Sequence, residues 1–306
     1  MYSEVPSIPR RRAQVPLASV VVPTYNRSSL LSRCLQSLET QAFDKAAYEV
    51  IVVDDGSADG TAELCTALRQ RTNMNLIYVR RQHRGGPASA RNNGIARAVG
   101  NVVAFIDDDC EAATDWLEQL TKPFRDPHVI GVEGKVVRHP GSTPFTHFVE
   151  NLDGGLFLTA NIAYRREALD SVGGFDETYH HAAAEDWDLA FRILERGGKV
   201  QFCAEALVVH APVPINGRHF IDRVQERRSA VILYQRFPRR WELITGRTMS
   251  RSFFEGILMG PVVEMRKWGS YFSSHRSEVP RFLLWQILAS GRLLVEYVRL
   301  RHAGLA

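Results

Sequence analysis

VVAFIDDDC, residues Val102–Cys110, decides the fold, because a short apolar run leads directly into three carboxylates, Asp107, Asp108 and Asp109. A continuous apolar run of this length is typical of a strand buried on both faces, as in a parallel sheet. Open α/β sheets bind ligands at the carboxyl ends of such strands. The three carboxylates repel one another, and a hard divalent cation would relieve that repulsion. Because strand side chains alternate, we expect Asp107 and Asp109 to share a face as a metal clamp, with Asp108 pointing away. The alternative is a solvated acidic turn that ends the strand.

Strands and helices alternate on both sides of this stretch. Apolar segments predict strands at Ala18–Pro23, Glu49–Val53, Asn75–Val79 and Val129–Val137, and helical segments such as Ala88–Val99 lie between them. This alternation is typical of an α/β fold with a parallel, doubly wound sheet. The second strand ends in Asp54 and Asp55. Two strands therefore place carboxylates on what should be one edge of the sheet, which indicates a site.

Composition and charge divide the chain into segments. The 306 residues, 45% of them hydrophobic and 24% charged, are enough for one large globular domain or two smaller ones. Pro212 and Pro214 mark a boundary. We expect a flexible N-terminal arm at 1–16, an α/β domain at 17–212 and a helical C-terminal region at 213–306. Residues 211–306 hold 16 Lys and Arg against 7 Asp and Glu, so the C-terminal region is basic.

The cysteines and the lengths of the apolar runs indicate in which cellular compartment the protein works. The four cysteines, Cys34, Cys65, Cys110 and Cys203, lie far apart without a CxxC pair. This excludes a disulfide framework or a zinc cluster and fits a reducing compartment. The N-terminal sequence lacks the apolar segment of a secretory signal, and no uninterrupted apolar run reaches the roughly 18–20 residues that cross a bilayer. We expect a cytoplasmic protein.

The C-terminal region is predicted to be helical, basic and aromatic, with helices at Phe220–Phe237, Phe253–Trp268 and Phe282–Leu300. In the last helix the apolar run Phe282–Gly291 is bounded by Arg281 and Arg292. Two interpretations remain open. The helices lie in the interface of an anionic membrane, as a peripheral contact at its inner face, or they pack on the sheet or on a second subunit of a homo-oligomer. Nucleic acid is not an expected partner, because the aromatic residues fall among aliphatic ones rather than on a polar platform.

Six motifs appear in a characteristic order: PTYNR (Pro23–Arg27), VVDDGS (Val52–Ser57), GGPASARNNG (Gly85–Gly94), VAFIDDDC (Val103–Cys110), GGFDE (Gly173–Glu177) and AEDWDL (Ala184–Leu189). Together they resemble the family 2 glycosyltransferases over about residues 17–212. The resemblance implies a GT-A fold, a Rossmann-like, mostly parallel sheet flanked by helices, here with a C-terminal helical extension. It also implies binding of a nucleotide-diphosphate sugar, usually with Mg or Mn, and inversion at the anomeric carbon.

The resemblance assigns a nucleotide-binding set from the first two strand ends and the segment at 85–94: Pro23, Thr24, Tyr25, Arg27, Asp54, Asp55 and Arg91. Ionised carboxylates accept hydrogen bonds from base N–H groups and ribose hydroxyls, which suits Asp54 and Asp55. The alternative for that pair is an Asx turn before Gly56. Arg91 offers a fixed cation to ribose, phosphate or the aspartates, and a structural Arg91–Asp pair is also compatible with the site.

Asp107 and Asp109 resemble the Asp-x-Asp motif of the family, in which the first residue contacts ribose or metal and the second binds metal at the diphosphate. The middle residue sometimes contacts the donor sugar, which makes Asp108 a further candidate. His210 stands where relatives often carry a third metal ligand, and it is either that ligand or a structural histidine. Asn161 resembles a residue near the diphosphate and acceptor.

The catalytic base implied by the resemblance is Asp186, with Glu185 beside it. An inverting transfer needs a base that takes the proton of the acceptor hydroxyl, and two adjacent carboxylates raise the pKa of one another. The competing interpretation is capping of the helix that begins here. Trp187 either lines an acceptor pocket or belongs to the core.

The resulting prediction is a metal-dependent inverting glycosyltransferase acting on a glycan or lipid-linked acceptor in cell-surface polysaccharide synthesis. Three other function classes are compatible with parts of the sequence. A non-catalytic nucleotide-sugar-binding scaffold of a membrane glycan assembly is the main alternative, and the intact Asp186 argues against it. Nucleotidyl transfer is disfavoured because no Gly- and Lys-rich phosphate loop is present, and nucleic-acid binding for the reason given above. The sequence leaves the sugar, the nucleotide, the acceptor and the oligomeric state open.

Overall fold

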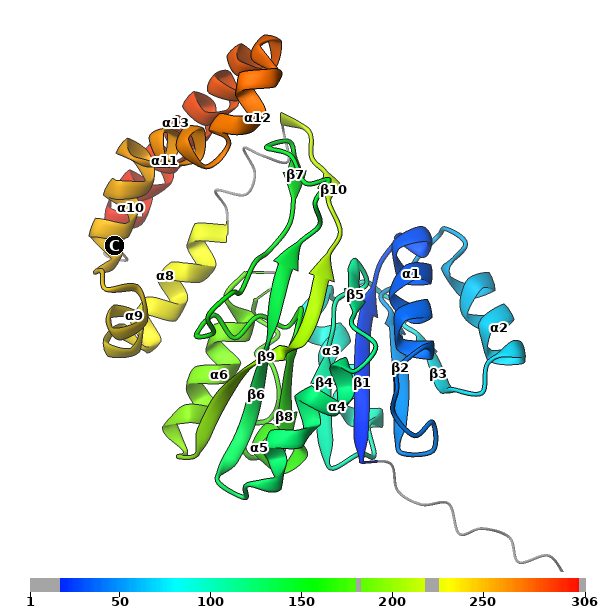
Figure 1. The fold of residues 1–306 in the computed structure, drawn as a ribbon. Coiled ribbons are helices and arrows are strands. Elements are labelled where there is room, and N and C mark those ends of the chain that lie inside the picture. Colours follow the sequence, from blue (N-terminus) through cyan, green and yellow to red (C-terminus); the bar gives the residue numbers. More distant parts are fainter. Residues whose placement is uncertain (1–16, 180–182, 218–225, 303–306) are drawn as a thin grey trace, which may run out of the picture.

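The computed structural model describes residues 17–179, 183–217 and 226–302. The predicted arm at 1–16 and the start of the predicted helix from Phe220 lie outside this range. Within it, the chain forms one large mixed sheet with helices on both faces and a separate layer of helices from the C-terminal region (Figure 1). No helix in the described ranges has both the length and the apolar character needed to pass through a membrane.

The large sheet has eight strands in the order β3-β2-β1-β4-β8-β6-β9-β5. The strands are β1 (Ala18–Thr24), β2 (Tyr48–Asp54), β3 (Asn75–Arg80), β4 (Val102–Phe105), β5 (Cys110–Ala112), β6 (Val129–Arg138), β8 (Ile162–Arg165) and β9 (Lys199–His210). The first four in this order run parallel, as the sequence predicts. Beyond β4 the sheet is mixed, because β8 pairs antiparallel with both β4 and β6. A small second sheet joins β7 (Thr146–His147) to β10 (Val213–Pro214).

One predicted pair of strands is a single strand in the structure. The sequence suggests separate strands at Val200–Phe202 and Ala206–Val209, whereas β9 runs unbroken through both beside β6. The register between the two strands shifts at Gly134/Lys135, so an irregularity takes up the intervening residues without ending the strand. This long strand carries His210 to the edge of the sheet where Asp109 lies.

Helices cover the sheet on its two faces: α1 (Ser28–Glu39), α2 (Thr61–Arg71), α3 (Gly86–Arg97), α4 (Trp116–Thr121), η1 (Lys122–Arg125), α5 (Arg166–Val172) and α6 (Glu185–Glu195). Alternate residues of β1 serve the two faces, as strand geometry requires. Val20 and Val22 pack in the core cluster of α1, and Val21 packs in the cluster of α3. A Cβ on Gly94 of α3 would lie 2.4 Å from a methyl of Val21, so only glycine permits this close helix–sheet contact.

The C-terminal region folds as six α-helices within residues 226–302: α8 (Glu226–Arg236), α9 (Pro238–Thr245), α10 (Met249–Leu258), α11 (Gly260–Lys267), α12 (Gly269–Ser274) and α13 (Val279–His302), with η3 (Arg276–Glu278) before the last. The predicted helix at Phe253–Trp268 is broken between α10 and α11, because Pro261 lacks the N–H that would continue the helix. The predicted helix at Phe282–Leu300 lies inside α13.

Aromatic contacts hold these helices against the α/β part. Trp241 of α9 lies 5.7 Å from Trp187 of α6 between ring centroids. Trp285 of α13 lies 5.3 Å from Phe145, in an edge-to-face arrangement. Arg236 adds ion pairs from α8, including one of 3.0 Å to the fully buried carboxylate of Asp188 on α6. The end of α6 that carries the predicted base is therefore packed against the C-terminal region.

Candidate functional site

The three aspartates lie in a turn rather than on a strand. The strand β4 ends at Phe105, and the N–H of Cys110 donates to the carbonyl of Asp107 at 3.1 Å, which reverses the chain into β5. The expected alternation along a strand therefore does not hold. A single Nη1 of Arg27 contacts Asp108 at 3.1 Å and Asp109 at 2.9 Å, while Asp107 faces Arg91. Asp108 is thus part of the same charged cluster and does not point away from it.

Burial dominates the electrostatics of this cluster. Burial raises the pKa of Asp108 to about 7, against the opposing effect of the Arg27 guanidinium. Burial likewise raises the pKa of Asp109, and the neighbouring charge of Asp107 adds to it. Thr24 donates its hydroxyl to Asp108 at 2.7 Å. One partly exposed arginine thus offsets two buried carboxylates, and further positive charge is favoured at this end of the sheet.

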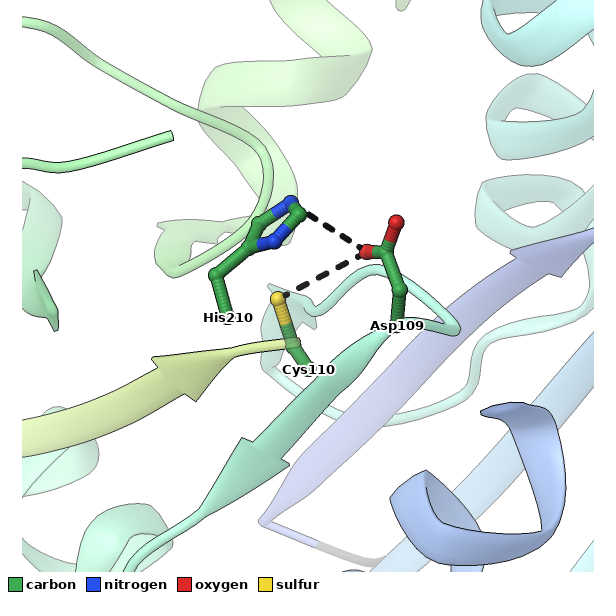
Figure 2. Close-up of side chains that lie close together, drawn as sticks. All are labelled: Asp109, Cys110 and His210. Carbon is green, nitrogen blue, oxygen red and sulfur yellow. Dashed lines mark hydrogen bonds and ion pairs between the residues drawn. The ribbon is translucent and has the colours of Figure 1, made fainter. Parts of the chain in front are cut away.

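His210 completes the cluster from the end of β9. Its Nδ1 lies 2.8 Å from the carbonyl oxygen of Ala211, and because a carbonyl only accepts, Nδ1 carries a proton. Its Nε2 faces the carboxylate of Asp109 at 3.4 Å, as Figure 2 shows. Asp109, His210 and Cys110 bring one ligand atom each within 4.8 Å of one another. Cys110 was missed from the sequence, although it directly follows the aspartates.

The ligand atoms of Asp109 and His210 suit a divalent cation that accepts nitrogen as well as oxygen ligands. A carboxylate oxygen and a histidine nitrogen oriented by a backbone carbonyl are usual ligands of such ions. Cys110 is fully buried, and burial raises the pKa of its thiol well above its usual range. Asp107 lies outside this ligand group and is bound to Arg91 instead at 2.7 Å. Of the three predicted metal ligands, the structure gathers Asp109 and His210.

The predicted Asp54/Asp55 pair divides into one residue bonded within the fold and one residue on the cavity wall. Asp54 is fully buried, and its carboxylate accepts from the N–H of Ser57 at 2.7 Å and the hydroxyl of Tyr78 at 2.6 Å. Asp54 thus stabilises the turn after β2, although its bond reaches three residues ahead and not two as in an Asx turn. Asp55 lines the cavity described below and accepts from the backbone N–H groups of Gly85 at 3.0 Å and Gly86 at 2.8 Å. Asp55 therefore fixes the loop that leads into α3.

The PTYNR segment lies along the same cavity, which Pro23, Thr24, Tyr25 and Arg27 all line. The guanidinium carbon of Arg84 lies 4.1 Å above the centre of the Tyr25 ring. Together, Tyr25 and Arg84 offer a flat, cationic surface beside Asp55. Such a surface can stack on a planar base and attract phosphate. Arg84 was not singled out in the sequence, because only the fold brings it over Tyr25.

Arg91 links the aspartate turn to the predicted catalytic pair. Its guanidinium is almost completely buried and contacts Asp107 through Nη2 at 2.7 Å and Glu185 through Nη1 at 2.9 Å. Burial alone would lower the pKa of Arg91, but these two carboxylates outweigh it and raise the pKa. Because both acids depend on one cation, the distance between the β4 turn and the start of α6 is fixed.

Asp186 lies at the start of α6, where Ala184 adopts the left-handed conformation at φ +70°. A non-glycine residue in that conformation is strained and is common at functional sites. Asp186 and Glu185 both line the cavity, and Glu185 is also buried and bound to Arg91. Burial raises the pKa of Asp186 well above its usual range, and the charge of Glu185 adds to the shift. Its carboxylate accepts from the N–H of Trp187 at 2.8 Å, and among the described residues no side chain caps the start of α6.

Asn161 does not line the cavity. Its side chain is buried, its amide nitrogen donates to the carbonyls of Lys135 at 2.9 Å and Ala206 at 2.7 Å, and its oxygen accepts from Trp116 at 2.8 Å. All these partners are structural, so Asn161 joins β6, β8 and β9 instead of reaching a ligand. The resemblance places it near a substrate because its neighbours Thr159 and Ala160 do line the cavity.

A cavity of about 1690 Å³ connects these groups. The aspartate turn, Asp55 and Arg84 line one part of it, and Asp186 and Trp187 line its middle. The C-terminal helices close the remaining side with Leu233, Trp241, Trp268, Phe282, Gln286 and Leu293. Trp187 therefore serves both as a cavity wall and as core packing against Trp241. A polar, charged end and a broad aromatic end fit two different substrates in one chamber.

The chain is similar in sequence to known glycosyltransferases. The chain is 34% identical over 210 residues to a pre-mycofactocin glycosyltransferase of Mycobacterium tuberculosis, covering 63% of this chain and 42% of the relative. It is 28% identical over 216 residues to the O-antigen chain rhamnosyltransferase RfbN of Salmonella typhimurium, covering 63% and 66% of the two chains. The chain thus spans less than half of the Mycobacterium relative.

A solved structure shares the fold over nearly the whole chain. The mannosyltransferase PcManGT from Pyrobaculum calidifontis, solved with GDP-Man and Mn²⁺, superposes with a TM-score of 0.64 at 22% identity, covering 94% of this chain and 87% of that one. The architecture is therefore the GT-A fold, as the motifs imply. The profile of Glycosyl transferase family 2 matches residues 19–183, more than half of the chain. On these grounds, the chain belongs to glycosyl transferase family 2.

Proposed function

We propose that this protein transfers a glycosyl group from a nucleotide-diphosphate sugar to a hydroxyl acceptor, with inversion at the anomeric carbon and with a divalent metal ion. The observation that carries the proposal is the buried bridge of Arg91, at 2.7 Å from Asp107 and 2.9 Å from Glu185. It holds the acidic turn and the base candidate Asp186 on the wall of one cavity. Transfer needs these two parts within the length of one sugar nucleotide.

The nucleotide would lie over the first strand ends. Tyr25 and Arg84 form a stacked surface for the base, and Asp55 offers carboxylate oxygens to base or ribose donors. Arg27 lies above Asp108 and Asp109, where the diphosphate would approach. Asp54 and Asn161 take no part in binding, because neither lines the cavity and their polar atoms are bonded within the fold.

Asp109 and His210 would hold the metal ion, which, when bound, neutralises charge on the departing nucleoside diphosphate. The imidazole nitrogen favours manganese over magnesium, which prefers oxygen ligands alone. Arg27 then remains as the second cation at the same end. A positively charged end of the cavity makes the diphosphate a better leaving group.

Asp186 acts as the general base. Its carboxylate takes the proton of the acceptor hydroxyl while the hydroxyl oxygen attacks the anomeric carbon, and the bond from that carbon to the diphosphate oxygen breaks on the opposite face. Direct displacement inverts the anomeric centre. The raised pKa of Asp186 makes it a stronger base than an ordinary carboxylate. Glu185 accepts a hydrogen bond from Arg91 through Oε1, and it acts as a residue that positions Asp186.

The acceptor would enter between Asp186 and the C-terminal helices. Trp187, Trp241 and Trp268 line that end, and sugar rings stack well on aromatic faces. A glycan or a lipid-linked saccharide of the cell surface fits a chamber of this size and character.

Donor hydrolysis in the absence of acceptor tests the proposal. A panel of UDP- and GDP-sugars is incubated with wild type, Asp109→Ala and Asp186→Asn, with Mn²⁺ or with chelator. We expect metal-dependent binding and slow hydrolysis of one donor, loss of both in Asp109→Ala, and retained binding in Asp186→Asn. The matched control is Asp170→Asn on α5, whose side chain is exposed. Metal-dependent donor binding without turnover on any acceptor would instead support a non-catalytic scaffold, and no donor binding would exclude both.

A further inference from the structure

The helix α13 is apolar on two opposite sides. Phe282, Leu293 and Leu300 are buried on its inner side, against α10 and the cavity. Its outer side carries large apolar side chains that are exposed, with Ile287 at 66% and Val295 at 64%. A helix that is apolar all round is normally covered on both sides. The outer side of α13 therefore has the composition of a contact surface.

The exposed residues form one continuous stripe. Leu283, Leu284, Ile287, Leu288, Leu294, Val295 and Val298 are exposed, and they recur every three or four residues. At 100° per residue they fall on one side of the helix. Gly291 lies within the same stripe, where it adds no polar group. The stripe thus runs along most of the 24 residues of α13.

Arginines follow one edge of this stripe. Arg281, Arg292 and Arg299 are exposed and are spaced by whole helical turns, so they form a row beside the apolar residues. Arg301 lies at the opposite edge and is also exposed. The one acidic residue of α13, Glu296, is buried and lies 3.6 Å from Arg299, and Glu278 of η3 lies 3.9 Å from Arg281. The exposed charge of this helix is therefore entirely positive.

The neighbouring helix α11 extends the surface. Met259, Val262 and Val263 are exposed beside α13. Between the two helices lies a hollow of about 330 Å³ lined by Pro261, Val262, Met265, Arg266 and Leu283. Arg266 is the only charged residue in that lining. An apolar hollow with one arginine in its lining fits a phospholipid whose acyl chain lies in the hollow and whose phosphate lies at Arg266.

We propose that α11 and the outer side of α13 bind the surface of a membrane that contains anionic lipids. The apolar stripe enters the acyl boundary, and the arginine row contacts lipid phosphates. The helices lie in the plane of the interface. A second copy of the chain is the less suitable occupant, because the arginine row of one copy would need acidic partners and α13 exposes none. This inference does not depend on the proposed reaction.

Vesicle flotation of the full chain tests the inference. Wild type is mixed with phosphatidylcholine vesicles, with and without phosphatidylglycerol. The double variant Ile287→Asp/Val295→Asp removes the stripe, and Arg292→Gln/Arg299→Gln removes part of the row. The matched control is Val99→Asp, an exposed valine at 53% on the α/β part. Circular dichroism and metal-dependent donor hydrolysis monitor folding and the reaction separately.

We expect wild type and the control to float with anionic vesicles only. The arginine variant should bind about 25-fold more weakly, because each of its two substituted residues contributes about fivefold near an anionic surface. The aspartate variant should not float at all while its donor hydrolysis is unchanged. Equal binding to neutral and anionic vesicles, or unchanged flotation of the aspartate variant, would overturn the inference. If wild type does not float but forms a dimer in light scattering, and the aspartate variant is a monomer, the surface binds a second copy of the chain and not a membrane.

Discussion

Asp107, in the turn after β4, and Glu185, at the start of α6, bind the two terminal nitrogens of a single buried guanidinium, that of Arg91, at 2.7 and 2.9 Å. Removing one partner of a buried ion pair costs about 3–5 kcal/mol, because the remaining charge is left uncompensated. We expect Arg91→Met to lower the free energy of unfolding by an amount of this order and to abolish transfer. Urea denaturation and donor turnover are the measurements. Arg97→Met on the exposed end of α3 serves as the control, and an equal loss there would contradict the buried bridge as the cause.

Asp186→Asn should separate binding from chemistry. The amide cannot take a proton, so kcat should fall by about 10²–10⁴-fold, the usual contribution of a general base. Donor affinity should stay within about twofold, because Asp186 contacts the acceptor side. Isothermal titration and single-turnover kinetics with a panel of acceptors measure the two quantities. Full turnover by the variant would exclude Asp186 as the base.

The acid side of the pH profile should reflect the raised pKa of Asp186. We expect turnover to fall as pH falls through that pKa, with a midpoint above the ordinary aspartate value of about 3.9. The stability effect has the opposite sign. The folded protein binds a proton at pH values where the unfolded chain has released it, so this contribution to stability is present below about pH 3.9 and is lost as pH rises toward the folded pKa. Thermal denaturation should show a shallower decline with pH in Asp186→Asn than in wild type.

His210→Ala should weaken manganese binding. Loss of a hydrogen-bond partner of a metal ligand already costs about 10–100-fold in affinity, so loss of the imidazole should cost at least about tenfold. Electron paramagnetic resonance of Mn²⁺ in titrations measures this directly, without activity. His128→Ala, an exposed histidine, should bind as wild type. Unchanged affinity in His210→Ala would leave His210 as a structural residue.

The sequence predicts the framework of the site well, for a physical reason. Residues 54–55 and 107–109 follow parallel strands, and such strands end at one edge of a sheet whatever the details of packing. The family motifs then narrow the chemistry. What periodicity could not predict is where a strand stops: β4 ends before Asp107, so the expected alternation of the three aspartates was wrong.

Residues that differ in role look alike in the sequence. Asp54 and Asp55 are adjacent carboxylates, yet only Asp55 lines the cavity, because the hydroxyl of Tyr78 on β3 binds Asp54. Asn161 is bonded by Trp116 and by two backbone carbonyls from distant strands. These partners are set by tertiary packing and leave no local pattern. The wall of C-terminal aromatic residues escaped prediction for the same reason, since contacts such as Trp187–Trp241 have no periodicity along the chain.

One helix separates the reaction chamber from the outside. Gln286, Ala289, Ser290 and Leu293 of α13 line the cavity, and Ile287 and Val295 of the same helix face outward. An α-helix with its side chains is about 10–12 Å across. If the outer side of α13 lies on a lipid surface, the saccharide of a lipid-linked acceptor has to extend from the membrane by no more than the width of that helix to reach Asp186. Enzyme and acceptor would then find each other by diffusion in two dimensions, and the rate of encounter would depend on their surface density instead of their concentration in solution.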